Sequence, residues 1–511
     1  MRLRLLLGLV LASLPACFLL EHKSESNVLL VVVDGLRIDA ISQSIGAART
    51  PNLQKLAAES LTFHACFAHS ASTLAAHAAI LSSRVPSTSG VRNDGQAVEA
   101  GVPLLTEYLQ REGWQTFGDV SSSALVPQSP QAGLDRGFDV FRTHDHDGAS
   151  AAEVNARLLP FLEHSSPDAP WFAYVQYCDP STAESDPQVA PTMAQVFLDG
   201  TPIGSARTDD EESWRVELDL TPGPHRIELR SESPFSLRRL DCFSSRTRLP
   251  PVLETGHLFT PLTAVVAAVT NDQDALLPVH IEARVRAVQT LEKCRARYKQ
   301  QVETVDRAVG EIVESLKKSG RYDDTLIVIT GSHGESLGEH GITGHDVTLF
   351  DEMLRVPLLV KPIASEDRRV ELARHQFELV RHVDIAPTIL ELVGEMSLAG
   401  AEGLSLLREG ERELVAETHP PEAPSTICAL RDDRYKLVYT AQEDRFEMYD
   451  VKSDTLEMEN LFALQGHFRS KWQLDLRALA QNAPQGADLH MSFAPKVDTS
   501  EKNDTPRAAK R

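Results

Sequence analysis

The sequence predicts an α/β protein with a doubly wound, mostly parallel sheet, an inserted small β unit and a C-terminal antiparallel subdomain. Uninterrupted apolar runs, typical of strands that are buried on both faces, occur at 28–33 and 326–329. Segments with helical periodicity lie between such runs, and this alternation indicates a parallel sheet covered by helices. Two other segments alternate polar and apolar residues, as strands of antiparallel sheets do.

Each core element has its own local signal. The strand at 27–33 ends at Asp34, and Thr50 with Pro51 supplies a cap residue and a first-turn proline for the helix that follows. A long amphipathic helix around 302–316 repeats apolar residues at steps of three and four and leads into the strand at 326–329. The other predicted core elements are helices at 52–60, 74–82, 102–112 and 385–393 and strands at 114–120, 171–177 and 357–360.

Two β units interrupt or follow this core. From 188 to 250 polar and apolar residues alternate between turn residues such as Asp199-Gly200, which predicts an inserted β unit. This unit is either an enlarged surface loop or a module that contacts glycans or gates the substrate. The expected divisions are a signal peptide at 1–17, a tether at 18–26, the α/β domain at 27–187 and 251–404, the insert at 188–250, a C-terminal subdomain at 405–480 with strands at 427–430, 435–439 and 446–449, and a disordered tail at 481–511.

Charge and the N-terminus restrict partners and location. The chain has 511 residues and 73 acidic against 51 basic side chains, a formal net charge of −22, which argues against nucleic-acid binding. Arg2 and Arg4 precede an apolar run at 5–14, as in a secretory signal peptide. The following Leu-Pro-Ala-Cys resembles a bacterial lipobox, which implies membrane attachment through a lipidated Cys17; plain secretion is the alternative. We therefore expect an exported protein of the bacterial cell envelope, in the periplasm or anchored to a membrane face.

Polar side chains stand at the carboxyl ends of the two apolar strands, where α/β proteins place their chemistry. Asp34 follows the first strand, and Ser332 and His333 follow the second. Thr73 begins the helical run at 74–82, where backbone N–H groups favour an anion, and His77 lies one turn further on the same face. Such a set indicates a cation at the strand ends and a nucleophile that attacks a phosphate or sulfate ester in line.

Several segments together resemble the sulfatase branch of the alkaline phosphatase superfamily. Individually they are weak motifs, but their order and spacing along 27–465 are specific. They are NVLLVVVDGLRID at 27–39, TPNLQKLAAES at 50–60, STLAAHAAILSSRVPSTSGV at 72–91, LDRGFDVF at 134–141, VDRAVGEIVESLKKSGRYDDTLIVITGSHGESLGEHG at 305–341, LFDEMLRVPLLV at 349–360, VDIAPTILELVG at 383–394 and DRYKLVYT at 433–440. The resemblance implies a metal-assisted ester hydrolase with Asp34 and His333 as metal ligands and His345 as a residue for the metal or the leaving group. Glu335, Glu339 and His340 are interpreted as residues that structure the loop.

The nucleophile position departs from the family pattern. Thr73 stands where these sulfatases have a Cys or Ser that is oxidised to formylglycine, and a threonine cannot yield that aldehyde. We therefore expect no formylglycine, and a threonine alcohol of the kind that phosphodiesterase and phosphotransferase relatives use as nucleophile. His77 replaces the family's Arg, Gly35 replaces a second Asp, and Ser181 replaces a His.

The metal position departs as well. Ser332 stands where the family has an Asp, which makes it a degenerate metal position and leaves Asp34, Thr73 and His333 as ligands. Because Mg²⁺ and Ca²⁺ require several oxygen ligands, one divalent ion of Zn²⁺ or Mn²⁺ is favoured. Two functions follow: a hydrolase of anionic sulfate or phosphate esters, with a glycan or a lipid as candidates for the rest of the substrate, or an impaired relative that acts as a binding or scaffold protein.

Overall fold

The structure is a computed structural model, and it describes most of the chain between residues 26 and 481. The described ranges are 26–41, 48–126, 133–144, 148–166, 169–180, 193–207, 214–244, 252–253, 262–271, 273, 275–287, 291–365, 368–396, 398–419, 426–465 and 470–481. The predictions for the signal peptide, Cys17 and Ser181, for nearly all of the tether, and for the tail beyond 481 lie outside these residues. None of the described helices is long and apolar enough to cross a membrane.

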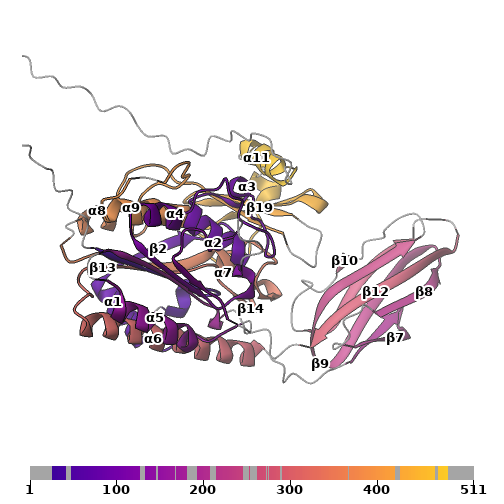
Figure 1. The fold of residues 1–511 in the computed structure, drawn as a ribbon. Coiled ribbons are helices and arrows are strands. Elements are labelled where there is room, and N and C mark those ends of the chain that lie inside the picture. Colours follow the sequence, from indigo (N-terminus) through magenta and orange to yellow (C-terminus); the bar gives the residue numbers. More distant parts are fainter. Residues whose placement is uncertain are drawn as a thin grey trace, which may run out of the picture.

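An eight-stranded sheet forms the centre of the main domain (Figure 1). Its spatial order is β17-β2-β16-β13-β1-β5-β3-β4, and β16 alone runs antiparallel to its neighbours. The strands are β1 Asn27–Val33, β2 Leu61–Phe67, β3 Gln115–Val120, β4 Val140–Arg142, β5 Trp171–Tyr177, β13 Thr325–Gly331, β16 Arg355–Lys361 and β17 Val380–Arg381. The expected mostly parallel, doubly wound sheet is confirmed.

Helices cover both faces of this sheet. Leu29, Val31 and Val33 of β1 belong to one apolar cluster, and the alternate β1 residues belong to the other, as the twofold period of a strand requires. The first face carries α1 Pro51–Glu59, α5 Ala151–His164 and α6 Leu291–Lys318, which Figure 1 shows along one side of the sheet. The second carries α2 Thr73–Ser82, α4 Leu105–Arg111 and α9 Ile385–Leu392.

Several short elements connect these layers. They are α3 Pro86–Ser89, α7 Asp351–Leu354, α8 Arg369–Ala373, β14 Ser336–Leu337, β15 Thr343–Gly344 and the 3-10 turns η1 Ile38–Ile41, η2 Ser123–Leu125, η4 Glu339–Gly341, η5 His382–Asp384 and η6 Ala441–Glu443. Among the larger elements of the central domain, β2 and α5 were not predicted. Pro160 inside α5 weakens its helical pattern, although Ser150 and Glu153 form a capping box that marks its start.

The inserted β unit extends further than the sequence suggested. It comprises β6 Met193–Leu198, β7 Thr201–Arg207, β8 Trp214–Leu220, β9 Gly223–Ser244, β10 Val252–Leu253, β11 Leu262–Asn271 and β12 Leu277–Ala287. The boundary at 250 is wrong, because β11 and β12 both pair antiparallel with β9. The apolar run in β11 resembles a strand of the central sheet, and periodicity alone cannot assign a buried strand to one of two sheets. The unit has its own apolar core, which contains no residue of the central sheet.

The C-terminal part forms a four-stranded antiparallel sheet, as expected. Its strands are β18 Leu414–Thr418, β19 Ile427–Arg431, β20 Tyr435–Thr440 and β21 Arg445–Asp450, and α10 Phe462–Gln465 and α11 Ser470–Gln481 follow. Trp472 and Leu476 of α11 pack on one face of the sheet. The opposite face packs against Phe67 and Met353 of the main domain.

A buried ionic network also ties this sheet to the main domain. Nη1 of Arg431 donates to Oδ2 of Asp351 at 2.7 Å, and Nζ of Lys436 donates to Oδ1 of Asp351 at 3.1 Å. Nζ of Lys436 also lies 2.7 Å from Oε1 of Glu457. Burial alone would raise the pKa of Asp351, but the two cations outweigh burial and hold this pKa at about 2. The carboxylate of Asp351 is therefore the common partner of two buried cations.

We expect Asp351→Asn to destabilise the folded protein by about 3–5 kcal/mol, because it leaves Arg431 and Lys436 without their shared anion. Chemical denaturation at neutral pH measures the loss. Glu409→Gln is the matched control, since Glu409 pairs with Arg374 at 3.4 Å with both side chains exposed, and such pairs contribute little. Equal effects of the two substitutions would contradict a role of the network in holding the C-terminal sheet.

Candidate functional site

The register of the central sheet brings the predicted strand-end residues together. Val33 of β1 pairs with Gly331 of β13, so Asp34 and Ser332 are the next residues on two neighbouring strands. The backbone N–H of Ser332 donates to the carbonyl of Val33 at 3.1 Å and continues the ladder by one step. On the other side of β1, Gln176 of β5 pairs with Val32. Asp34, Ser332 and Gln176 are all buried.

Asp34 is the centre of this buried group. Its Oδ1 accepts hydrogen bonds from Nε2 of His77, at 2.8 Å, and from the hydroxyl of Ser332. Its Oδ2 accepts a hydrogen bond from Nε2 of Gln176 at 2.6 Å. Burial alone would raise the pKa of Asp34, but His77, His333 and Ser332 together lower it below its ordinary value. Asp34 is therefore a carboxylate whose two oxygens both bind protein donors.

His77 lies on α2, one turn after Thr73, and links this helix to two strands. Its Nε2 contacts Asp34 at the end of β1, and its Nδ1 makes a hydrogen bond with the hydroxyl of Tyr174 in β5. The two rings meet edge to face, with centroids 6.0 Å apart. Burial and the nearby Asp34 raise the pKa of Tyr174, so its phenol keeps its proton. The imidazole of His77 is thus held at both nitrogens.

Thr73 and His333 form the second contact of the site. Oγ1 of Thr73 lies 3.2 Å from Nε2 of His333, and Nδ1 of His333 lies 2.8 Å from the carbonyl oxygen of Gly334. A carbonyl oxygen can only accept, so Nδ1 carries the hydrogen. Burial, with a further contribution from His345, lowers the pKa of His333 to about 3. The neutral ring therefore accepts the Thr73 proton at Nε2, and this contact orients the hydroxyl.

The start of α2 has an acidic partner that the sequence analysis missed. Oδ1 of Asp94 accepts hydrogen bonds at 2.8 Å from the backbone N–H of Leu74 and at 2.8 Å from the hydroxyl of Ser72. A carboxylate of the protein thus satisfies one of the N–H groups that were expected to favour a bound anion. Nothing in the sequence around Asp94 marks it as a cap, because it lies 20 residues after Leu74.

The loop after β13 adds a carboxylate and a second histidine. Nδ1 of His345 donates to Oε2 of Glu335 at 3.0 Å, and the rings of His345 and His333 stack with centroids 4.5 Å apart. One ligand atom each from His333, Glu335 and His345 can be chosen so that all lie within 4.8 Å of one another. The structure thus places His345 beside His333 and assigns Glu335 to the same group.

The metal site implied by the family resemblance does not fit the arrangement around Asp34. A divalent cation there would have to displace hydrogen bonds from His77, Ser332 and Gln176 to the two oxygens of Asp34. Ser332 offers a hydroxyl that donates to this carboxylate, so it adds no negative charge for a hard cation. The predicted set of Asp34, Thr73, Ser332 and His333 is assembled in space, but protein donors occupy its only carboxylate.

The site also contains residues from β5 that were not predicted. Gln176 is a polar residue next to the end of an otherwise fully buried strand, and this position could have marked it as a candidate. Tyr174 carried no such signal, because tyrosine is common in strands. Both contacts depend on how β5 lies against β1 and α2, which is a property of the tertiary structure.

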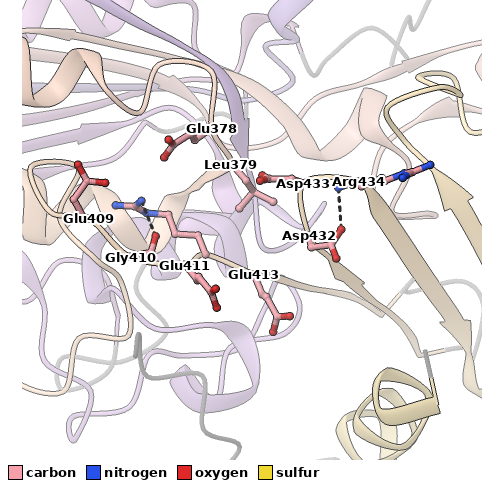
Figure 2. Close-up of a pocket in the computed structure, with 10 residues that line it drawn as sticks. Glu378, Leu379, Glu409, Gly410, Glu411, Glu413, Asp432, Asp433 and Arg434 are labelled. Carbon is pink, nitrogen blue, oxygen red and sulfur yellow. Dashed lines mark hydrogen bonds between the residues drawn. The ribbon is translucent and has the colours of Figure 1, made fainter. Parts of the chain in front are cut away.

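A surface cavity elsewhere does not belong to this site. It has a volume of about 710 Å³ and lies between the 409–413 segment and the 432–434 turn, as Figure 2 shows. Its lining residues are Glu378, Leu379, Glu409, Gly410, Glu411, Arg412, Glu413, Asp432, Asp433 and Arg434. Six carboxylates against two guanidinium groups make the cavity a poor receptor for an anionic ester, and none of the site residues described above lines it.

Comparisons with known proteins agree with this fold. A choline-sulfatase of Rhizobium meliloti is 23% identical over 86% of this chain and 82% of its own length. An N-acetylglucosamine-6-O-sulfatase of Bacteroides thetaiotaomicron is 24% identical over 90% of this chain and 87% of its own. Among solved structures, a phosphonate monoester hydrolase of Agrobacterium radiobacter has a TM-score of 0.58, 18% identity, and coverage of 89% of this chain and 95% of that chain.

Family models cover nearly the whole described chain. One described as N-sulphoglucosamine sulphohydrolase, C-terminal, matches residues 338–482, which contain the antiparallel C-terminal sheet. Another, described as Sulfatase, matches residues 26–395 and so includes both strand ends, α2 and the loop with His345. Because this second match spans well over half of the chain, the protein belongs to the sulfatase family, within the alkaline phosphatase superfamily.

Proposed function

We propose that this protein hydrolyses sulfate or phosphate esters with Thr73 as its nucleophile. The observation that carries the proposal is the hydrogen bond of 3.2 Å between Oγ1 of Thr73 and the neutral Nε2 of His333. A nucleophile, an acceptor for its proton and a carbonyl that orients the acceptor form the arrangement expected for covalent catalysis. Membership of the sulfatase family supports ester hydrolysis as the reaction class.

The chemistry proceeds in two steps. Oγ1 of Thr73 forms a bond to the phosphorus or sulfur atom as the bond to the leaving alkoxide breaks, and the Thr73 proton moves to Nε2 of His333. The leaving oxygen takes a proton from solvent or from the protonated form of His345, whose side chain is 25% exposed. Water then attacks the phosphorus or sulfur atom and breaks its bond to Oγ1, His333 returns its proton to Oγ1, and the excess proton of the water passes to solvent. Because a base of such low pKa removes a hydroxyl proton poorly, slow turnover is expected.

The surroundings favour substrates with one negative charge. Burial raises the pKa of Asp346 to about 7, and the nearby Asp94, Glu335 and Asp34 contribute to this rise. A site whose carboxyl group already resists ionisation because it is buried, with other carboxylates nearby, disfavours a phosphate dianion. Phosphodiesters and sulfate monoesters carry a single charge and are the better candidates. A glycan or a lipid is proposed for the rest of the molecule.

The hydrogen bonds around Asp34 favour a second candidate function. In that case the protein retains the fold and a polar pocket but binds its ligand without turnover, as a scaffold or receptor. For either function, the basic and apolar N-terminal residues 1–17 support export to the cell envelope, with lipidation at Cys17 as the proposed attachment. The N-terminal segment itself lies outside the described residues.

Thr73→Ala tests the nucleophile. We expect it to lower turnover of an aryl phosphodiester or aryl sulfate by roughly 10³-fold or more, because no other hydroxyl takes the place of Oγ1. Thr73→Ser is the matched control and should retain activity, since it preserves the hydroxyl. Release of the aryl alcohol, followed with and without added Zn²⁺, Mn²⁺, Mg²⁺ or Ca²⁺, provides the measurement. Absence of turnover by the native protein under all these conditions would favour the binding function.

Ser332→Asp tests whether position 332 decides how well the residues around Asp34 suit a metal ion. It places a second buried carboxylate beside Asp34, so the variant should melt at a lower temperature than the native protein in the presence of a chelator. Added Mn²⁺ or Ca²⁺ should raise the melting temperature of the variant again, because two carboxylates and His333 can then hold a cation. Ser332→Asn is the control without charge. Equal melting temperatures of Ser332→Asp with chelator and with metal would show that position 332 does not control metal binding.

The low pKa of His333 predicts the acidic side of the pH profile. A base with a pKa of about 3 is neutral throughout the physiological range, so kcat/KM should show no inflection near pH 6.5, the ordinary histidine value. Folding stability depends on pH in a different way. It is not reduced by His333 above the pKa that this residue has in the unfolded chain, about 6.5. It declines as the pH falls below that value, because only the unfolded chain then takes up the proton. Rates are therefore measured at a temperature where the protein stays folded. An inflection near pH 6.5 that persists both in His345→Gln and in Asp346→Asn, which removes the nearby carboxyl group of pKa about 7, would contradict a neutral His333.

A further inference from the structure

The loop that follows β13 brings a separate set of metal-binding side chains together. We propose that His333, Glu335 and His345 bind a transition-metal ion of the Zn²⁺ type, at a position displaced from Asp34 and Ser332. We further propose, on the basis of the proposed function, that a metal ion held there inhibits hydrolysis. It does so because it takes Nε2 of His333 away from Thr73.

Backbone pairing explains how the three residues meet. Ser336 of β14 pairs antiparallel with Gly344 of β15, so the residues just outside this pair, Glu335 and His345, stand opposite each other at the open end of the hairpin. His333 lies two residues before Glu335, at the end of β13. The observed contacts agree, with Nδ1 of His345 at 3.0 Å from Oε2 of Glu335 and its ring stacked on that of His333.

The ligand chemistry selects the kind of metal. Two imidazoles and one carboxylate form a set that zinc commonly uses, with a fourth position left for water or a substrate atom. Mg²⁺ and Ca²⁺ prefer all-oxygen surroundings and are not expected to bind here. Zn²⁺, or Co²⁺ as its spectroscopic substitute, is therefore the appropriate probe.

The geometry requires a small closing movement. The donor atoms lie within 4.8 Å of one another, whereas ligand atoms around a tetrahedral zinc ion are about 3.4 Å apart. His333 and Glu335 are almost fully buried, but the side chain of His345 is 25% exposed. His345 is thus both the route of entry for the ion and the residue that moves inward.

The link to catalysis comes from one atom. Nδ1 of His333 donates its hydrogen to the carbonyl of Gly334, so Nε2 carries the lone pair. The same Nε2 accepts the Thr73 hydroxyl at 3.2 Å. A metal ion and the Thr73 proton cannot both use that lone pair. Occupation of the site by Zn²⁺ therefore removes the proton acceptor from the nucleophile.

Direct binding tests the site independently of turnover. The full-length native protein, treated with a chelator and then desalted, is titrated with Zn²⁺ by calorimetry and with Co²⁺ by visible absorption. We expect one ion per chain, with affinity reduced about tenfold or more in Glu335→Gln and His345→Ala. Asp34→Asn should still bind Zn²⁺, because Asp34 is not a ligand. His64→Ala controls for surface histidines, since His64 is exposed and stacks on Phe377 elsewhere on the molecule.

Activity is the second readout. Zn²⁺ should lower aryl ester turnover of the native protein over the concentrations at which it binds, whereas Glu335→Gln should keep its own zinc-free rate. The displaced site would be overturned if the native protein does not bind one Zn²⁺ ion per chain. It would also be overturned if Asp34→Asn loses Zn²⁺ binding while His345→Ala retains it. If the native protein binds zinc but shows no turnover, the metal site is supported. The same result would overturn the proposed inhibition and would count against the proposed hydrolase. Thermal melts of each variant establish that it is folded.

Discussion

The buried carboxylate of Asp34 is the constraint on which the rest of the site depends. A charge at the end of a central strand loses its water, at a cost of several kcal/mol, unless neighbours replace that water. Here the replacement comes from three elements: α2 through His77, β13 through Ser332 and β5 through Gln176. Each of these side chains is buried and directed at the same two oxygens. The carboxylate therefore determines how helix and strands approach one another at this edge of the sheet.

This arrangement provides a way for a sulfatase fold to stabilise the strand-end carboxylate without a cation. The resemblance predicted that a metal ion would neutralise Asp34. In the structure, polar donors of the protein perform that task, and the lowered pKa of Asp34 shows that they compensate its charge. Because His77 lies one turn after Thr73, the contact that satisfies Asp34 also sets the position of the nucleophile. His77 and Ser332 thus form a pair that contacts the same oxygen of Asp34.

The carboxylates around Thr73 give the site an acidic character that differs from simple anion recognition. Asp94 caps the helix that carries Thr73, Glu335 contacts His345, and burial, with a further contribution from these carboxylates, raises the pKa of Asp346. Such surroundings limit the charge that a bound ester can bring. They also place the carboxylate of Glu335 beside two stacked histidines, and this combination of ligands suits a transition metal better than a hard cation.

Local sequence determined much of this protein. Apolar runs and helical periods predicted the parallel core, the C-terminal sheet, α2 with Thr73 at its start, and the strand ends that carry Asp34, Ser332 and His333, because these features depend on residues close together in the chain. Only the tertiary structure decided which partners those side chains have. Gln176, Tyr174 and Asp94 come from distant segments, and β11 joins the insert rather than the core because it pairs with β9. A strand signal cannot specify its neighbours, and a polar residue cannot specify its partner. Whether Asp34 meets a metal ion or a histidine is therefore decided by packing.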